Sequence, residues 1–221
     1  MLDVLGEAFP LAMGIALSPL PTIAIVLVLL APPGRRGGTA FLAARLVAVG
    51  AVVGLFAVVS DVAERSGDAA PAVAVTQVIV GAALLLVALK TWRGRPRGGV
   101  EPDLPGWMSS IEGRTPGQSA QLAAVLTLAN PKELLLAIGT GVAIGSGGLP
   151  IGQTVVVAAV LTAVACINVI APVVAFLLAG ERVRAPLSSA RAALVRHNAT
   201  IMSIVLVAIA ALLVSGGIAD L

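Results

Sequence analysis

Two short clusters combine prolines with hydrogen-bonding side chains near the middle of long apolar segments. The first, Ser18–Thr22, reads SPLPT, and the second, Asn130–Glu133, reads NPKE. A proline inside a helix removes a backbone donor and clashes with the carbonyl four residues earlier, so the helix kinks or unwinds there. The freed backbone groups can bind a ligand together with the hydroxyl and amide side chains of the clusters. Each cluster could therefore hold a polar group in apolar surroundings.

The second cluster also carries charge. An ionisable group at the centre of a membrane span costs about 2.5–3.5 kcal/mol to insert, so Lys132 and Glu133 are expected to have a function. Lys132 is one of only two lysines in the chain, against twelve arginines. We expect Lys132 to attract an anionic substrate group and Glu133 to carry a coupling proton. The alternative is a structural ion pair that fixes the unwound segment to another helix.

Two further polar residues are candidates. Arg45 lies six positions into the second apolar segment. We expect it to snorkel to the cytoplasmic interface, the alternative being that it reaches into the cavity from the inner mouth. Asn168, near Pro172 in the fifth segment, could contact a ligand or form an interhelical hydrogen bond. The complete set of candidate substrate-binding residues is Ser18, Pro19, Pro21, Thr22, Asn130, Pro131, Lys132, Glu133, Arg45 and Asn168.

Residue sets typical of metal and catalytic sites are not found in the sequence. His197 is the single histidine and has no acidic cluster nearby, so we expect no metal site. Cys166 is the single cysteine, which excludes an internal disulfide and a thiol relay. We expect it to pack as a small apolar residue, or else to line the cavity. An enzyme acting inside the membrane would need a convergent nucleophile or metal set, so we predict no catalytic residue, no cofactor and no enzymatic activity.

The composition indicates which elements must position these residues. Of the 221 residues, 58% are hydrophobic and only 11% are charged, and the mean hydropathy is +1.05. Six apolar stretches each reach the roughly 20 residues that a helix needs to cross about 30 Å of hydrocarbon. They cover residues 8–31, 39–60, 72–92, 119–145, 151–179 and 194–215. We therefore predict an all-α integral membrane protein with six transmembrane helices.

Arginines in the loops predict the orientation. Nine of them fall in residues 32–38, 93–118 and 180–193, and only Arg65 falls on the opposite face. Because lysine and arginine favour the cytoplasmic side, both termini are expected outside. The net charge of +3 is then explained by the arginines of the cytoplasmic loops. It does not indicate a nucleic-acid surface, so we expect no nucleic-acid partner.

The chain contains a weak internal duplication. Superposing Pro19 on Pro131 aligns two halves of three spans each, and an odd number of spans places the second half upside down. Many secondary transporters are built from such inverted repeats, with sites at the midplane between broken helices. We predict two inverted three-helix repeats with broken helices 1 and 4, within a single transmembrane domain over residues 1–221. Repeat one covers 1–92, a cytoplasmic linker rich in proline and glycine covers 93–118, and repeat two covers 119–221.

The proline clusters resemble the motifs of a known family. The Ser-Pro-Leu-Pro run from Ser18 and the Asn-Pro-Lys run from Asn130 are similar to paired signatures of the lysine exporter (LysE) superfamily. They are most similar to its GAP/Sap branch, the glycopeptidolipid- and sulfolipid-addressing proteins. The resemblance implies a multi-pass exporter of the bacterial inner membrane that moves envelope lipids. The amino-acid exporters usually have glycine where this chain has Leu20, and the thiol-reducing members use a cysteine pair, which Cys166 alone cannot provide.

These observations together predict a secondary transporter that exports an amphipathic or anionic small molecule or an envelope lipid, with proton coupling if Glu133 titrates. The expected partners are membrane lipid and the small-molecule or lipid substrate, with a second copy of the chain or a separate lipid exporter as further candidates. One alternative is an accessory protein that assists a lipid exporter without transporting. Another is an exporter of amino acids or ions, although a divalent cation would need several midplane carboxylates and Glu133 is the only one.

Overall fold

The computed structural model describes residues 1–65 and 114–189, together with 79, 82–83, 85–90, 93, 204, 207 and 210–211. These residues are helical or lie in turns between helices, and none of them is in a strand. Most of the third and sixth predicted spans, 72–92 and 194–215, and most of the linker 93–118 lie outside the described residues. The six-span arrangement and its inverted symmetry therefore stay predictions.

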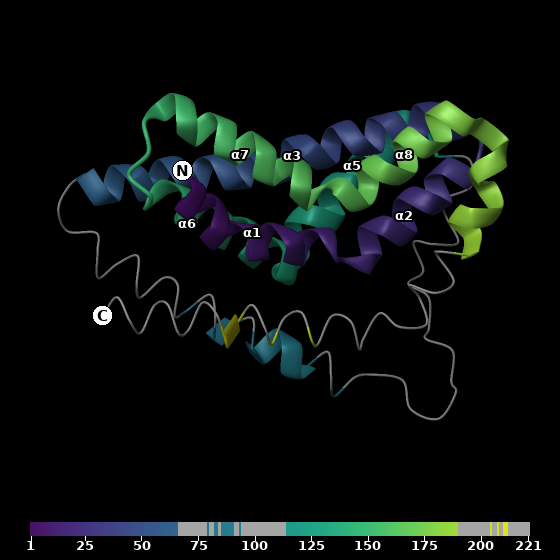
Figure 1. Cartoon of the computed structure of the whole chain (residues 1–221). Coiled ribbons are helices and arrows are strands. Elements are labelled where there is room, and N and C mark those ends of the chain that lie inside the picture. Colours follow the sequence, from purple (N-terminus) through teal and green to yellow (C-terminus); the bar gives the residue numbers. More distant parts are fainter. Residues whose placement is uncertain are drawn as a thin grey trace.

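Residues 1–65 and 114–189 form the helices of Figure 1. They are α1 (Leu2–Ala16), α2 (Pro19–Leu30), α3 (Gly34–Arg65), α5 (Pro116–Leu128), α6 (Pro131–Gly145), α7 (Ile151–Ala165), α8 (Ile167–Ala179) and the short 3-10 helix η2 (Gly180–Val183). Among the described helices, α3 alone is long and apolar enough to cross a membrane by itself, over Gly34–Glu64 with a mean hydropathy of 2.4. Three pairs of consecutive helices pass the same test when the two helices of a pair are counted as one span. These pairs are α1–α2, α5–α6 and α7–α8, and the bends between their helices are 50°, 73° and 69°.

The breaks in the first and fourth predicted spans lie at the proline clusters, as the sequence predicts. Pro19 is the first residue of α2 and Pro131 is the first residue of α6. Proline suits this position because its amide would have no helical partner there, and its ring forces the preceding residue out of the helical conformation. Accordingly Ser18 has φ/ψ of −72°/116° and Asn130 has −91°/106°. The Asn130 side chain then caps α6 by accepting a hydrogen bond from the Lys132 amide at 3.2 Å.

A third break, which the sequence did not predict, divides residues 151–179 into α7 and α8. Helix α7 ends at Ala165, and Cys166, with φ/ψ of −98°/4°, separates it from α8. Pro172 lies inside α8, six residues beyond the break, so this proline does not mark the bend. The fifth predicted span is thus two helices, like the first and fourth.

Helix α3 packs against α2, α5, α6, α7 and α8, above all against α5 and α6. Two glycines of α6 make this contact close: a Cβ at Gly141 would lie 2.5 Å from the Val53 carbonyl oxygen, and one at Gly145 would lie 2.3 Å from that of Ala57. Ser60 of α3 adds a hydrogen bond to the Val142 carbonyl at 3.3 Å. Small residues four apart permit such contact between membrane helices.

Two arginines connect one end of the described bundle. Arg35 of α3 donates from Nη2 to the Leu177 carbonyl near the end of α8 at 2.8 Å, and Arg184, just beyond η2, donates from Nη1 to the Leu30 carbonyl at the end of α2 at 3.1 Å. The last carbonyls of a helix have no partner within the helix. Each arginine therefore satisfies a helix end contributed by the other half of the chain.

Replacing Gly145 with alanine tests the contact between α3 and α6. The new Cβ would clash with backbone, which side-chain movement cannot relieve, so we expect Gly145→Ala to destabilise the protein by about 1–3 kcal/mol. The control is Gly6→Ala in α1, where a Cβ would meet nothing within 4 Å. Thermal unfolding of both variants in detergent measures the effect, and equal melting temperatures would contradict the packing described here.

Candidate functional site

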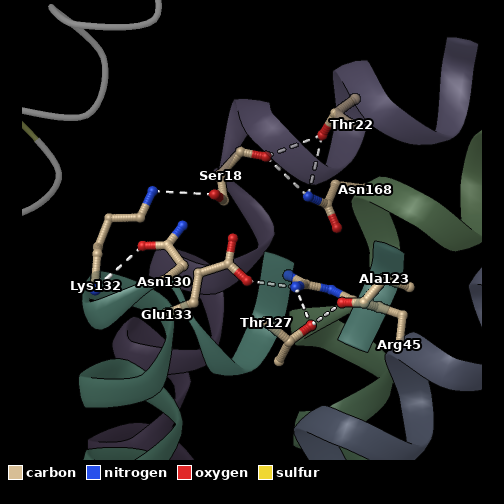
Figure 2. Close-up of polar contacts among 9 residues, drawn as sticks. All are labelled: Ser18, Thr22, Arg45, Ala123, Thr127, Asn130, Lys132, Glu133 and Asn168. Atoms are coloured by element: carbon tan, nitrogen blue, oxygen red, sulfur yellow. Dashed lines mark hydrogen bonds and ion pairs between the residues drawn. The ribbon is translucent and has the colours of Figure 1, made fainter. Parts of the chain in front are cut away.

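A buried ion pair joins α3 to the first turn of α6. Nη1 of Arg45 contacts Oε2 of Glu133 and also donates to Oγ1 of Thr127 at 2.7 Å, as Figure 2 shows. The Thr127 hydroxyl in turn donates to the Ala123 carbonyl at 2.8 Å. The side chains of Arg45 and Glu133 are 0% and 1% exposed. Charges buried this deeply require a partner because they have lost their hydration.

The position of Arg45 corrects the expectation that it snorkels to the cytoplasmic interface. That prediction is wrong because Glu133 and Thr127 supply buried partners, so the guanidinium has no need to reach water. The alternative, an arginine that reaches inward, describes the structure. Glu133 fixes the start of α6 to α3. This is the structural ion pair that the sequence analysis gave as the alternative to proton coupling.

Lys132 joins the first two breaks. Its Nζ donates to the Ser18 hydroxyl at 3.0 Å, and Ser18 is the residue that immediately precedes α2. Ser18 and Lys132 are both buried. Figure 2 shows Lys132 pointing toward Ser18 and Glu133 pointing toward Arg45, in line with the roughly 100° between neighbouring helical positions.

Asn168 joins the third break to the first. Its Nδ2 donates to the Ser18 carbonyl and to the Thr22 hydroxyl, both at 3.1 Å, while Thr22 donates to the same carbonyl at 3.0 Å (Figure 2). Of the two readings that the sequence left open for Asn168, the interhelical hydrogen bond is present. The backbone freed by the first break is therefore satisfied by a side chain from the third.

The three prolines among the candidates lie at the starts of helices. Pro19 and Pro21 are buried in the first turn of α2, and Pro131 is exposed at the start of α6. They shape the backbone. The structure brings together the polar candidates, which are Ser18, Thr22, Arg45, Asn130, Lys132, Glu133 and Asn168. We call these seven residues the break cluster.

Two neighbours of the break cluster were not among the candidate substrate-binding residues. Thr127 is 1% exposed and lies in the last turn of α5. Its hydroxyl, less than one turn before the break at Asn130, was a signal in the sequence that could have identified it. Cys166 is fully buried in the apolar core, as expected, and also lies within electrostatic range of Arg45 and Glu133. The signal for Cys166 was weak because no proline accompanies that break.

A comparison with protein families identifies the chain. The family model described as Sap, sulfolipid-1-addressing protein, matches residues 9–219. The chain belongs to this family. The match confirms the resemblance to the Sap branch that the two proline clusters indicated. No curated protein and no solved structure matches the chain.

Several buried polar atoms of this Sap-family protein lack a hydrogen-bond partner among the described residues. They are Nε and Nη2 of Arg45, Oε1 of Glu133 and Oδ1 of Asn168. An unsatisfied buried polar group costs about 1–3 kcal/mol, and more when it is charged. Donors and acceptors of this kind are retained where water or a ligand completes them. Within the described residues no three His, Cys, Asp or Glu side chains lie together, so we assign no metal ligand.

A double-mutant comparison tests whether the buried pair acts as a unit. Arg45→Met leaves Glu133 as an uncompensated buried charge, so we expect a loss of about 3–5 kcal/mol, whereas Arg45→Met combined with Glu133→Gln should recover part of it. Thermal or denaturant unfolding in detergent measures both. Arg36→Met, at an exposed arginine of α3, is the matched control. A double variant less stable than the Arg45→Met variant would argue against the pairing.

Proposed function

We propose that this protein acts in lipid export or addressing, by binding the anionic headgroup of an amphipathic lipid at the break cluster. The observation that carries the proposal is that three helix breaks are joined by buried and half-buried polar side chains. Lys132 and Asn168 both reach Ser18, and Arg45 pairs with Glu133 beside Cys166. Non-helical backbone at membrane depth is tolerated only where protein encloses it or where it lines a cavity. The family name, which refers to a sulfolipid, supports the substrate class.

The proposed architecture is a multi-pass protein of the bacterial inner membrane with six spans, two inverted repeats and both termini outside. The bends of α1–α2 and α5–α6 support the repeat, since each begins a half of the chain. The apolar stretches of the sequence and the distribution of arginines support the number of spans and the orientation.

Transport in this scheme requires the two halves to move against each other around the break cluster. Lys132 attracts the anionic group, and Glu133 couples the cycle to a proton. The bonds from Arg35 to Leu177 and from Arg184 to Leu30 hold one end closed, and opening on that side would break both. The protein does no covalent chemistry in this proposal: it is not an enzyme and uses no cofactor.

One observation favours the accessory role instead. Lys132 contacts Ser18 and Arg45 contacts Glu133, as residues that only hold broken helices together would. A protein of this kind would assist a separate lipid exporter without moving lipid itself.

A flux assay separates the two roles. Purified protein is reconstituted in liposomes with a panel of anionic lipids and amino acids, with and without a pH gradient. We expect Lys132→Ala to reduce flux of an anionic substrate about tenfold, because a hydrogen bond to a charged group contributes about 1.5–3 kcal/mol. Lys90→Ala, at the exposed second lysine, is the matched control and should keep the wild-type rate. Wild-type protein that moves none of these solutes would support the accessory role.

A further inference from the structure

Arg45 presents an unused edge for anion binding. A guanidinium has five N–H donors in a planar fork, and the edge formed by Nε and Nη2 matches the oxygens of a carboxylate, sulfate or phosphate. Arg45 uses only Nη1, for Glu133 and Thr127, while Nε and Nη2 have no partner among the described residues. The side chain is fully buried, so bulk water does not satisfy these donors. The Cys166 thiol lies close enough to Arg45 to accept a hydrogen bond, but a thiol is a weak acceptor and cannot replace an anion.

The Arg45–Glu133 pair itself is neutral before any ligand binds. Arg45 and Glu133 cancel each other, so a bare anion added to the pair would leave it with a net negative charge where charge is costly. The other groups that face the pair are Thr127 of α5, which does not ionise, the Cys166 thiol between α7 and α8, and Lys132, whose ammonium is directed to Ser18. Uptake of one proton by Glu133 together with the anion restores the balance.

We propose that Glu133 is the internal counter-ion of Arg45, and that a monovalent anionic group binds the Nε–Nη2 edge of Arg45 as Glu133 takes up a proton. The proton goes to Oε1, the carboxylate oxygen without a partner, and the new O–H can donate to the incoming anion. The pair with its ligand then carries the same net charge as the empty pair. This inference rests on the proposed function and adds its coupling: the anion and one proton bind together and cross together, without net charge movement.

Proton-linked binding of n-octyl sulfate tests the inference. Its single charge does not titrate near neutrality, so any proton taken up must go to the protein. Calorimetry of protein in phosphatidylcholine nanodiscs, in two buffers of different ionisation enthalpy, gives the number of protons per bound anion. We expect about one proton, and an affinity that falls about tenfold per pH unit while Glu133 is ionised in the unliganded protein. Empty nanodiscs and neutral n-octyl glucoside are the blanks.

Two variants and a control assign the residues. Glu133→Gln should bind the sulfate without proton uptake and independently of pH, and Arg45→Lys, which lacks the fork, should bind it at least about tenfold more weakly. Arg36→Gln, at an exposed arginine, should match wild type. Wild-type binding without proton uptake, or no binding at any pH, would overturn the inference, and the wild-type measurement alone decides this if a variant fails to fold.

The failure of this inference can be distinguished from failure of the proposed function. Proton-linked binding without flux in liposomes would leave the coupled site in place and remove the transport role. Flux of an anionic lipid without proton uptake on binding would leave the transport role and remove the coupling.

Discussion

The need to satisfy backbone hydrogen bonds within hydrocarbon governs the described structure. Lipid offers no donors or acceptors, so each break in a helix must find partners inside the protein. The break before Pro19 frees the Ser18 carbonyl, and Asn168 and Thr22 both donate to it. The break before Pro131 is capped by the side chain of Asn130. Each of the two proline breaks therefore recruits a polar side chain, and these side chains meet because the helices that carry them pack together.

The close contact between α3 and α6 makes the charged part of the cluster feasible. Gly141 and Gly145 bring α6 against the backbone of α3, and on the same two helices Glu133 meets Arg45. A buried pair adds little stability compared with apolar residues of similar size, and losing one partner is costly. Within the described part of the chain, two donor nitrogens of Arg45 and one oxygen of Glu133 also have no hydrogen-bond partner, so stability alone does not explain this pair.

Prediction from the sequence succeeded where one residue acts locally. Proline restricts its own backbone and that of the residue before it, so the positions of the first two breaks followed directly from Pro19 and Pro131. It failed where partners lie far apart in the chain. Arg45 was expected at the interface because its partner Glu133 is 88 positions away in the chain. The break at Cys166 was not predicted because no proline lies beside it.

The sequence by itself determined the helical, strongly apolar character of the protein, the places where two of its helices break, and its membership of the Sap family. These properties depend on composition, on local backbone restriction and on short motifs. Only the tertiary structure decided which polar groups meet. The pairs of Lys132 with Ser18, Asn168 with Ser18 and Arg45 with Glu133 depend on helix packing, which sets the distance between side chains that are remote in the chain.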